Sequence, residues 1–110
     1  VLDYKNPIQG KNFDRIQEMN SYAISVMDDA CLALFKKDYD QAEKSIGRAN
    51  NIQKYEKRIL DNLKTSKDEE EIFRIRRIVE NVKRVAEYAS DIGEIVLNMN
   101  IEKILEKPKM

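Results

Sequence analysis

Residues 75–96 read IRRIVENVKRVAEYASDIGEIV and carry the longest regular hydrophobic pattern in the chain. Apolar or small residues recur there in alternating steps of four and three, namely Ile75, Val79, Val82, Ala86, Ala89, Gly93 and Val96. Because an α-helix has 3.6 residues per turn, these residues share one face. The pattern predicts a long amphipathic helix, whose buried stripe is widened by Ile78, Val85 and Ile92.

This helix is expected to begin after Ser66, which has capping-box spacing to Glu69. Nothing interrupts the pattern before Pro108, so the helix is predicted to reach residue 107, a length of about 58 Å at 1.5 Å per residue. Its smallest residues are expected to let a neighbouring helix approach closely, namely Ala86, Ala89 and Gly93.

Two shorter helices are predicted before it. The first covers 12–36 and has its apolar stripe at Phe13, Ile16, Ala23, Met27, Ala30 and Leu34, flanked by Met19, Ile24, Val26, Cys31 and Phe35. A tight reversal follows at Lys36-Lys37-Asp38, where Asp38 is a good N-cap residue with Gln41 three positions later. The second helix covers 39–64 and is buried through Ala42, Ile46, Ala49, Ile52, Ile59, Leu60 and Leu63.

The short connections make consecutive helices antiparallel neighbours. We therefore predict an all-α fold, an antiparallel up-down-up three-helix bundle over 12–107 with a long third helix. Residues 1–11 hold one Pro and one Gly without a sustained period, and they are expected to form a flexible lead-in or linker. Gly47 lies inside the second helix at a cost in helix propensity, and close helix approach would explain it.

Composition excludes several classes of function. The 110 residues contain no His, which rules out Ser-His-Asp and Cys-His catalysis and His-ligated metals, and we expect no enzyme. Cys31 is the single cysteine, so no internal disulfide or thiolate zinc site exists. Twenty Lys and Arg balance twenty Asp and Glu, which argues against direct nucleic-acid binding. No apolar run is long enough for insertion into a membrane.

The long third helix is expected to extend about 18 Å beyond its shorter neighbours. This extension would leave a group of large apolar side chains in water, namely Leu97, Ile101, Ile104 and Leu105. A second subunit is the simplest cover for them, so we predict a homodimer.

Two carboxylates are candidates for metal binding. Glu87 and Asp91 are four residues apart, which makes them neighbours on the helix surface, and Arg84 and Glu94 lie on the same side. One interpretation is a solvated charged face. The other is a site for a hard cation, such as Mg, Mn, Ca or ferric iron, with the remaining ligands supplied by water, a neighbouring helix or another copy of the chain.

Arg74, Arg76 and Arg77 form the main basic cluster. Their guanidinium groups could recognise phosphate, but pairing within the helix, Glu70 with Arg74 and Glu80 with Arg84, is the simpler expectation.

The ordered residues at 83–94, KRVAEYASDIGE, resemble a segment of one repeat of the PhoU family of phosphate-uptake regulators. The matching positions are Arg84, Ala86, Glu87, Ala89, Asp91, Ile92 and Glu94, whereas Lys83 replaces the usual leading acid. The resemblance covers about residues 13–100 and includes Met27, Ala30, Ala33, Leu34, Asp38 and Ala42.

The resemblance implies an intracellular prokaryotic regulator that represses phosphate uptake through contacts with a transporter and its signalling kinase. It also implies that Glu87 and Asp91 match a family motif, Glu/Asp-x-x-x-Asp, that binds iron or other metal ions in some members. Family members have two three-helix repeats, so a single repeat suggests either a dimer or a missing second piece. The start at Val1 is compatible with the C-terminal part of a chain that carries an AbrB-type DNA-binding domain.

Three functions therefore stand as hypotheses. The first is a PhoU-like interaction module in the cytoplasm, a location that the lone Cys31 and the lack of a signal segment also favour. The second is a carboxylate-based metal protein that uses Glu87 and Asp91 with acids from neighbouring helices, such as Asp28, Asp29 or Asp40. The third is a generic helical scaffold.

Overall fold

The computed structural model describes residues 10–105, and all regular structure in this range is α-helical. The helices are α1 (Gly10–Lys36), α2 (Tyr39–Asn50), α3 (Ile52–Leu63) and α4 (Glu69–Leu105). The predicted all-α fold is confirmed. The expected lead-in ends two residues early, because Gly10 and Lys11 belong to α1. The rest of the lead-in, residues 1–9, and the expected end of the last helix at 106–107 lie outside the described residues.

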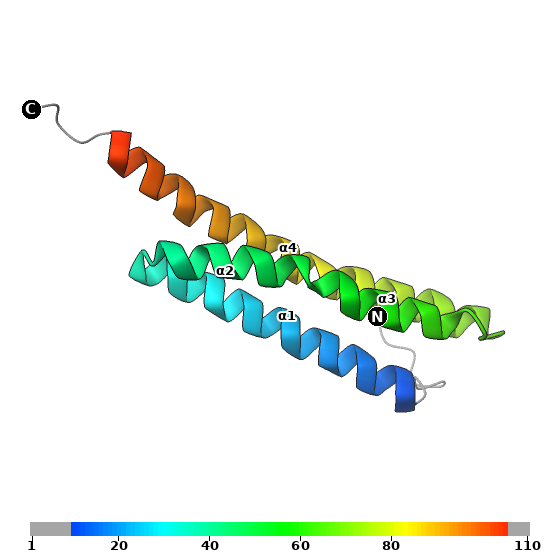
Figure 1. The fold of residues 1–110 in the computed structure, drawn as a ribbon. Helices are drawn as coiled ribbons and strands as arrows, with labels where there is room; N and C mark the ends of the chain where they lie inside the picture. Colours follow the sequence, from blue (N-terminus) through cyan, green and yellow to red (C-terminus); the bar gives the residue numbers. More distant parts are fainter. Residues whose placement is uncertain (1–9, 106–110) are drawn as a thin grey trace, which may run out of the picture.

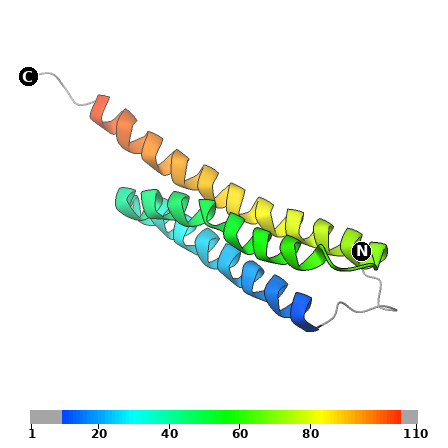
Figure 2. The same ribbon diagram turned by 45° about the vertical axis from the view of Figure 1, so that its right-hand side comes forward.

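The helices lie lengthwise against each other in an elongated bundle (Figure 1). The chain reverses direction between α1 and α2 and again between α3 and α4, and both views show α2 and α3 following one another along one rod (Figures 1 and 2). α4 continues past the turn between α1 and α2 (Figure 2). None of residues 98–105 is buried, and we call this segment the overhang.

The core is centred on the predicted stripe of α4. All seven of its positions are buried, and Ile78, Val85 and Ile92 are partly buried beside them. The stripe packs against residues of the other helices that form the main core cluster, including Ile16, Met19, Ala23, Val26, Ala30, Ala49, Ile52, Ile59 and Leu63. A second, smaller cluster lies near the α1–α2 turn and joins Ala33, Ala42 and Val96 to Tyr39 and Leu97.

The stripe predicted for α1 is partly wrong. Phe13 and Leu34 are 47% and 39% exposed, whereas the residues that complete the buried face are Met19, Val26 and Ala33. Three residues expected at the flanks of this face are also exposed, namely Ile24, Cys31 and Phe35. The predicted stripe placed the large residues Phe13 and Leu34 at its two ends. The buried face instead keeps a regular three-four spacing from Ile16 to Ala33 and ends on two alanines, Ala30 and Ala33.

The single helix predicted over 39–64 is interrupted at Asn51. The Asn51 N–H lies 3.1 Å from the Arg48 carbonyl oxygen and 3.3 Å from that of Gly47, and the Lys54 N–H bonds the Asn51 carbonyl oxygen at 3.0 Å. These three-residue bonds tighten the chain locally. Asn50 and Asn51 are adjacent residues of low helix propensity, close after Gly47, which explains the position of the break.

The turn between α1 and α2 is built on Lys37, the single non-glycine residue with positive φ among the described residues, at 54°. The Lys37 N–H bonds the Leu34 carbonyl oxygen at 3.3 Å, and the Asp38 N–H bonds that of Ala33 at 2.9 Å. This pattern is a Schellman motif with lysine at the position that glycine usually occupies. Asp38 then caps α2 as predicted, because its Oδ1 accepts the Gln41 N–H at 3.0 Å.

The cap predicted for the last helix is wrong by two residues. Asp68 Oδ1 accepts the Glu71 N–H at 3.1 Å, whereas Ser66 Oγ accepts the Asp68 N–H at 3.3 Å in the preceding loop. Aspartate is at least as good an N-cap as serine, and its charge also suits the positive end of the helix dipole.

The close approach predicted at Gly93 is confirmed. A Cβ atom at Gly93 would lie 2.8 Å from Ile46 Cγ1 and 3.0 Å from the Ala42 carbonyl oxygen, so α2 rests directly on the backbone of α4. Gly47 has no such neighbour within 4 Å, so close approach does not explain that glycine.

Candidate functional site

The predicted metal pair lies on an open face of α4. Glu87 and Asp91 are both exposed, as are Arg84 and Glu94 on the turns before and after them. Ala86, just before Glu87, and Ala89, between the two carboxylates, are buried against the rest of the bundle. The structure therefore presents the two carboxylates outward.

The described residues of one chain do not complete a metal site around this pair. Within residues 10–105, no three His, Cys, Asp or Glu side chains gather closely enough to hold a metal ion. Asp28, Asp29 and Asp40, which were suggested as further ligands, are thus not brought to Glu87 and Asp91. Any further protein ligands would have to come from outside this part of the chain.

Asp29 instead belongs to a polar cluster between α1 and the α2–α3 rod that the sequence did not reveal. Arg48 of α2 forms an ion pair with Asp29, and its second guanidinium nitrogen donates to Ser25 Oγ at 2.6 Å. The guanidinium also lies 5.0 Å from the centre of the Tyr22 ring. Tyr22 stacks on Tyr55 of α3 at 4.7 Å.

The Tyr22 hydroxyl donates to the Arg48 carbonyl oxygen at 2.9 Å. These contacts tie α1 to both sides of the break at Asn51, so the cluster holds the interrupted rod in place. We assign it a structural role. Sequence analysis did not predict this cluster because its side chains come from three different helices and meet only when the helices pack.

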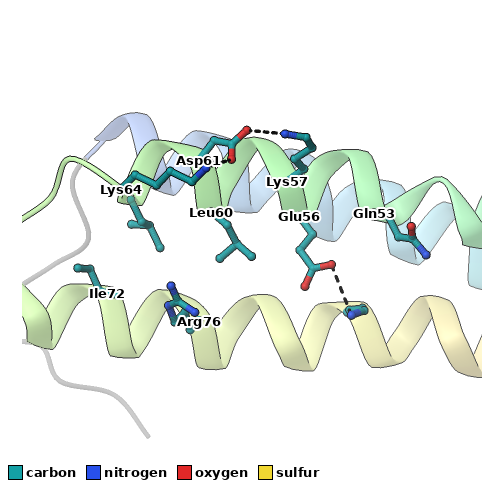
Figure 3. A pocket seen from close by; sticks show the side chains of 10 residues that line it. Gln53, Glu56, Lys57, Leu60, Asp61, Lys64, Ile72 and Arg76 are labelled. Carbon is teal, nitrogen blue, oxygen red and sulfur yellow. Dashed lines mark hydrogen bonds and ion pairs between the residues drawn. The ribbon is translucent and has the colours of Figure 1, made fainter.

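A groove of about 710 Å³ lies between α3 and α4 (Figure 3). Three apolar side chains contribute to its walls, namely Leu60, Leu63 and Ile72. α2 packs closely along α4, whereas α3 packs more loosely against it. The looser packing leaves this space open between α3 and α4. Figure 3 shows Leu60 extending from α3 toward α4, with Arg76 on the α4 side of the space. We call this space the α3–α4 groove.

Charged side chains surround the α3–α4 groove. Asp61 pairs with Lys57 at 3.0 Å and with Lys64 at 3.3 Å. Glu56 of α3 pairs with Lys83 of α4 at 3.4 Å. The hydrogen bond from Lys57, followed by that from Lys64, holds the pKa of Asp61 below its ordinary value.

Arg76 differs from the other groove cations because it has no ion pair or hydrogen bond within the described residues. Its neighbour Arg77 points elsewhere, since its guanidinium lies 5.8 Å from the centre of the Phe73 ring. The predicted pair of Glu80 with Arg84 does not form in the described part of the chain. The basic cluster of the sequence thus divides between different surfaces.

Comparison with known proteins identifies the family. A family model described as PhoU domain matches residues 16–96, which is more than half of the chain. The chain belongs to the PhoU family. No curated protein and no solved structure matches it.

The PhoU match begins at Ile16 and ends at Val96, the first buried residue of α1 and the last buried residue of α4. The PhoU domain therefore coincides with the packed part of the bundle and contains both the exposed carboxylate pair and the α3–α4 groove. The overhang lies beyond the match. None of the described helices is apolar over a length that would cross a membrane.

Proposed function

We propose that this PhoU domain regulates phosphate uptake or phosphate signalling by binding other proteins, and that it catalyses no reaction. The observation that carries the proposal is the match of the PhoU family to the whole packed part of the bundle. The partners we propose are a phosphate transporter or its signalling kinase. We propose the cytoplasm as the location, because the domain could contact both partners there. The proposal takes the chain as one up-down-up repeat, which the two chain reversals in Figure 1 support.

We further propose that the chain acts as a homodimer. Ile101, Ile104 and Leu105 of the overhang are 53%, 59% and 78% exposed, and burial of such side chains contributes about 1.5–3 kcal/mol each. Leu97, which was expected to join them, is instead half-buried and packs on the small core cluster of its own chain. A two-fold dimer through the other three would also supply six rods, with α2 and α3 counted as one, as in a PhoU protein with two three-helix repeats.

A metal-binding role is the second candidate, and the outward placement of Glu87 and Asp91 on one face of α4 favours it. Iron or another hard cation would take these carboxylates together with ligands from a second copy or from water. Elemental analysis of protein purified without chelator tests this role. Metal retained by the natural chain and lost in Glu87→Gln with Asp91→Asn supports it, whereas equal metal content in both contradicts it.

The partner proposal is tested by pull-down of the tagged full chain from lysates grown with abundant or scarce phosphate. We expect the phosphate transporter or its kinase to be recovered in an amount that depends on phosphate. A matched control is the double variant Ile59→Asp with Val79→Asp, which places charges in the core and disrupts the bundle. Recovery that is equal for the folded and the disrupted chain, or absent for both, contradicts the proposal.

A further inference from the structure

The α3–α4 groove has the length of a short helix. Its lining residues run from Gln53 to Lys64 along one side and from Ile72 to Lys83 along the other. Each side covers 11 residue steps, which corresponds to about 16 Å or three turns at 1.5 Å per residue. Leu60 and Ile72 are half-buried, so each presents part of an apolar side chain to the groove, whereas Leu63 beneath them belongs to the core.

The charge of the groove is complementary to an acidic occupant. Four cations line it, namely Lys57, Lys64, Arg76 and Lys83, against the two carboxylates of Glu56 and Asp61. Asp61 pairs with Lys57 and Lys64, and Glu56 pairs with Lys83. Both carboxylates of the groove are therefore already engaged in ion pairs within the protein. Arg76 remains for an external carboxylate, and its planar guanidinium can accept one through two parallel hydrogen bonds.

We propose that the α3–α4 groove binds an acidic amphipathic α-helix of a partner protein. The apolar face of this helix would lie on the accessible parts of Leu60 and Ile72. A carboxylate on its edge would pair with Arg76. Such an arrangement is a helix-in-groove interaction, which uses apolar side chains spaced three, four and seven residues apart. A bound helix would fill the space that α3 leaves open beside α4. The inference rests on the proposed function only in that both give the chain a protein-binding role.

The groove also differs in position from the other exposed surfaces. Its lining lies in α3 and the first part of α4, whereas the overhang is at the opposite end of α4 (Figures 1 and 3). A dimer through the overhang therefore leaves the groove open, and the two surfaces can be tested independently.

The test is a fluorescence anisotropy titration of the full chain with a labelled helical peptide of about 14 residues. The peptide carries leucines on one face and glutamates elsewhere, and a second peptide replaces the glutamates with lysines. We expect the acidic peptide to bind and to lose affinity by at least about tenfold in Arg76→Glu. The matched control is Arg77→Glu, which makes the same charge change on the adjacent exposed residue outside the groove, and we expect less than about a twofold effect.

Several results overturn the inference. One is failure of the acidic peptide to bind. Equal loss of affinity in Arg76→Glu and Arg77→Glu would show nonspecific attraction, and equal affinity for the lysine peptide would remove the role of charge. If Arg76→Glu alone converts a dimer into a monomer by light scattering, the occupant is a second copy. The titration contains neither phosphate nor a transporter, so its failure leaves the test of phosphate regulation unaffected.

Discussion

At the scale of single residues, Gly93 sets how closely α2 approaches α4. We expect Gly93→Ala to destabilise the fold by about 1–2 kcal/mol, because overpacking against Ile46 and the Ala42 backbone exceeds the gain in helix propensity. Gly47→Ala is the matched control and should stabilise by about 0.5–1 kcal/mol, since no atom lies within 4 Å of its new Cβ. Urea unfolding followed by circular dichroism measures both, and a stabilising Gly93→Ala would contradict this packing.

The ion pairs of Asp61 predict a pH effect at the same scale. The pKa of Asp61 is lowered in the folded chain, first by the hydrogen bond from Lys57 and then by that from Lys64. The stabilisation is therefore present above the ordinary aspartate pKa and is lost as the pH falls through the lowered value. In a carboxylate NMR titration, Lys57→Ala should raise the Asp61 pKa more than Lys64→Ala does. The reverse order would show that Lys64 is the main partner.

At the scale of elements, the α1–α2 turn carries strain at Lys37. A left-handed conformation costs a residue with a side chain about 1–2 kcal/mol, and glycine avoids this cost but loses more entropy on folding. We expect Lys37→Gly to stabilise the protein by about 0.5–1 kcal/mol. Lys36→Gly is the neighbouring control within α1 and should destabilise it by a similar amount. Thermal unfolding that shifts both variants in the same direction would argue against the Schellman motif.

The elements also show what the sequence can and cannot predict. The α4 stripe was predicted position by position because seven regularly spaced residues agree on one face. In α1 the choice between Leu34 and Ala33 depended on the neighbouring helix, which accepts a small residue there. The break at Asn51 was missed because each residue near it is tolerated in a helix individually. Cys31 was misplaced for the same reason as Leu34, since apolar character alone does not fix the rotation of a helix.

The candidate sites differ in the same way. Glu87 and Asp91 could be found from sequence because they are four residues apart on one helix. The α3–α4 groove could not, because its lining residues on α3 and α4 come together only through the packing of the two helices. The availability of Arg76 could not be predicted either. It depends on the pairing of Asp61 and Glu56 with the groove lysines, which the side-chain geometry determines.

At the scale of the whole molecule, the overhang predicts self-association. The chain should have the mass of a dimer in light scattering at micromolar concentrations, because its exposed apolar side chains need cover. Ile101→Asp with Ile104→Asp should reduce the mass to that of a monomer while circular dichroism stays helical, since both residues lie outside the core. Ile95→Asp, an exposed α4 residue before the overhang, is the matched control and should remain dimeric. A monomeric natural chain would contradict the proposed dimer.

We propose that this PhoU domain regulates phosphate uptake, and its resemblance to phosphate-uptake regulators implies that it represses uptake. The most direct measurement is the initial rate of radiolabelled phosphate uptake by source cells in phosphate-rich medium, with the coding sequence intact, deleted, or deleted and restored. We predict a higher uptake rate after deletion and a return to the original rate after restoration. An uptake rate that is the same in all three strains, in rich and in phosphate-poor medium, would contradict the claim.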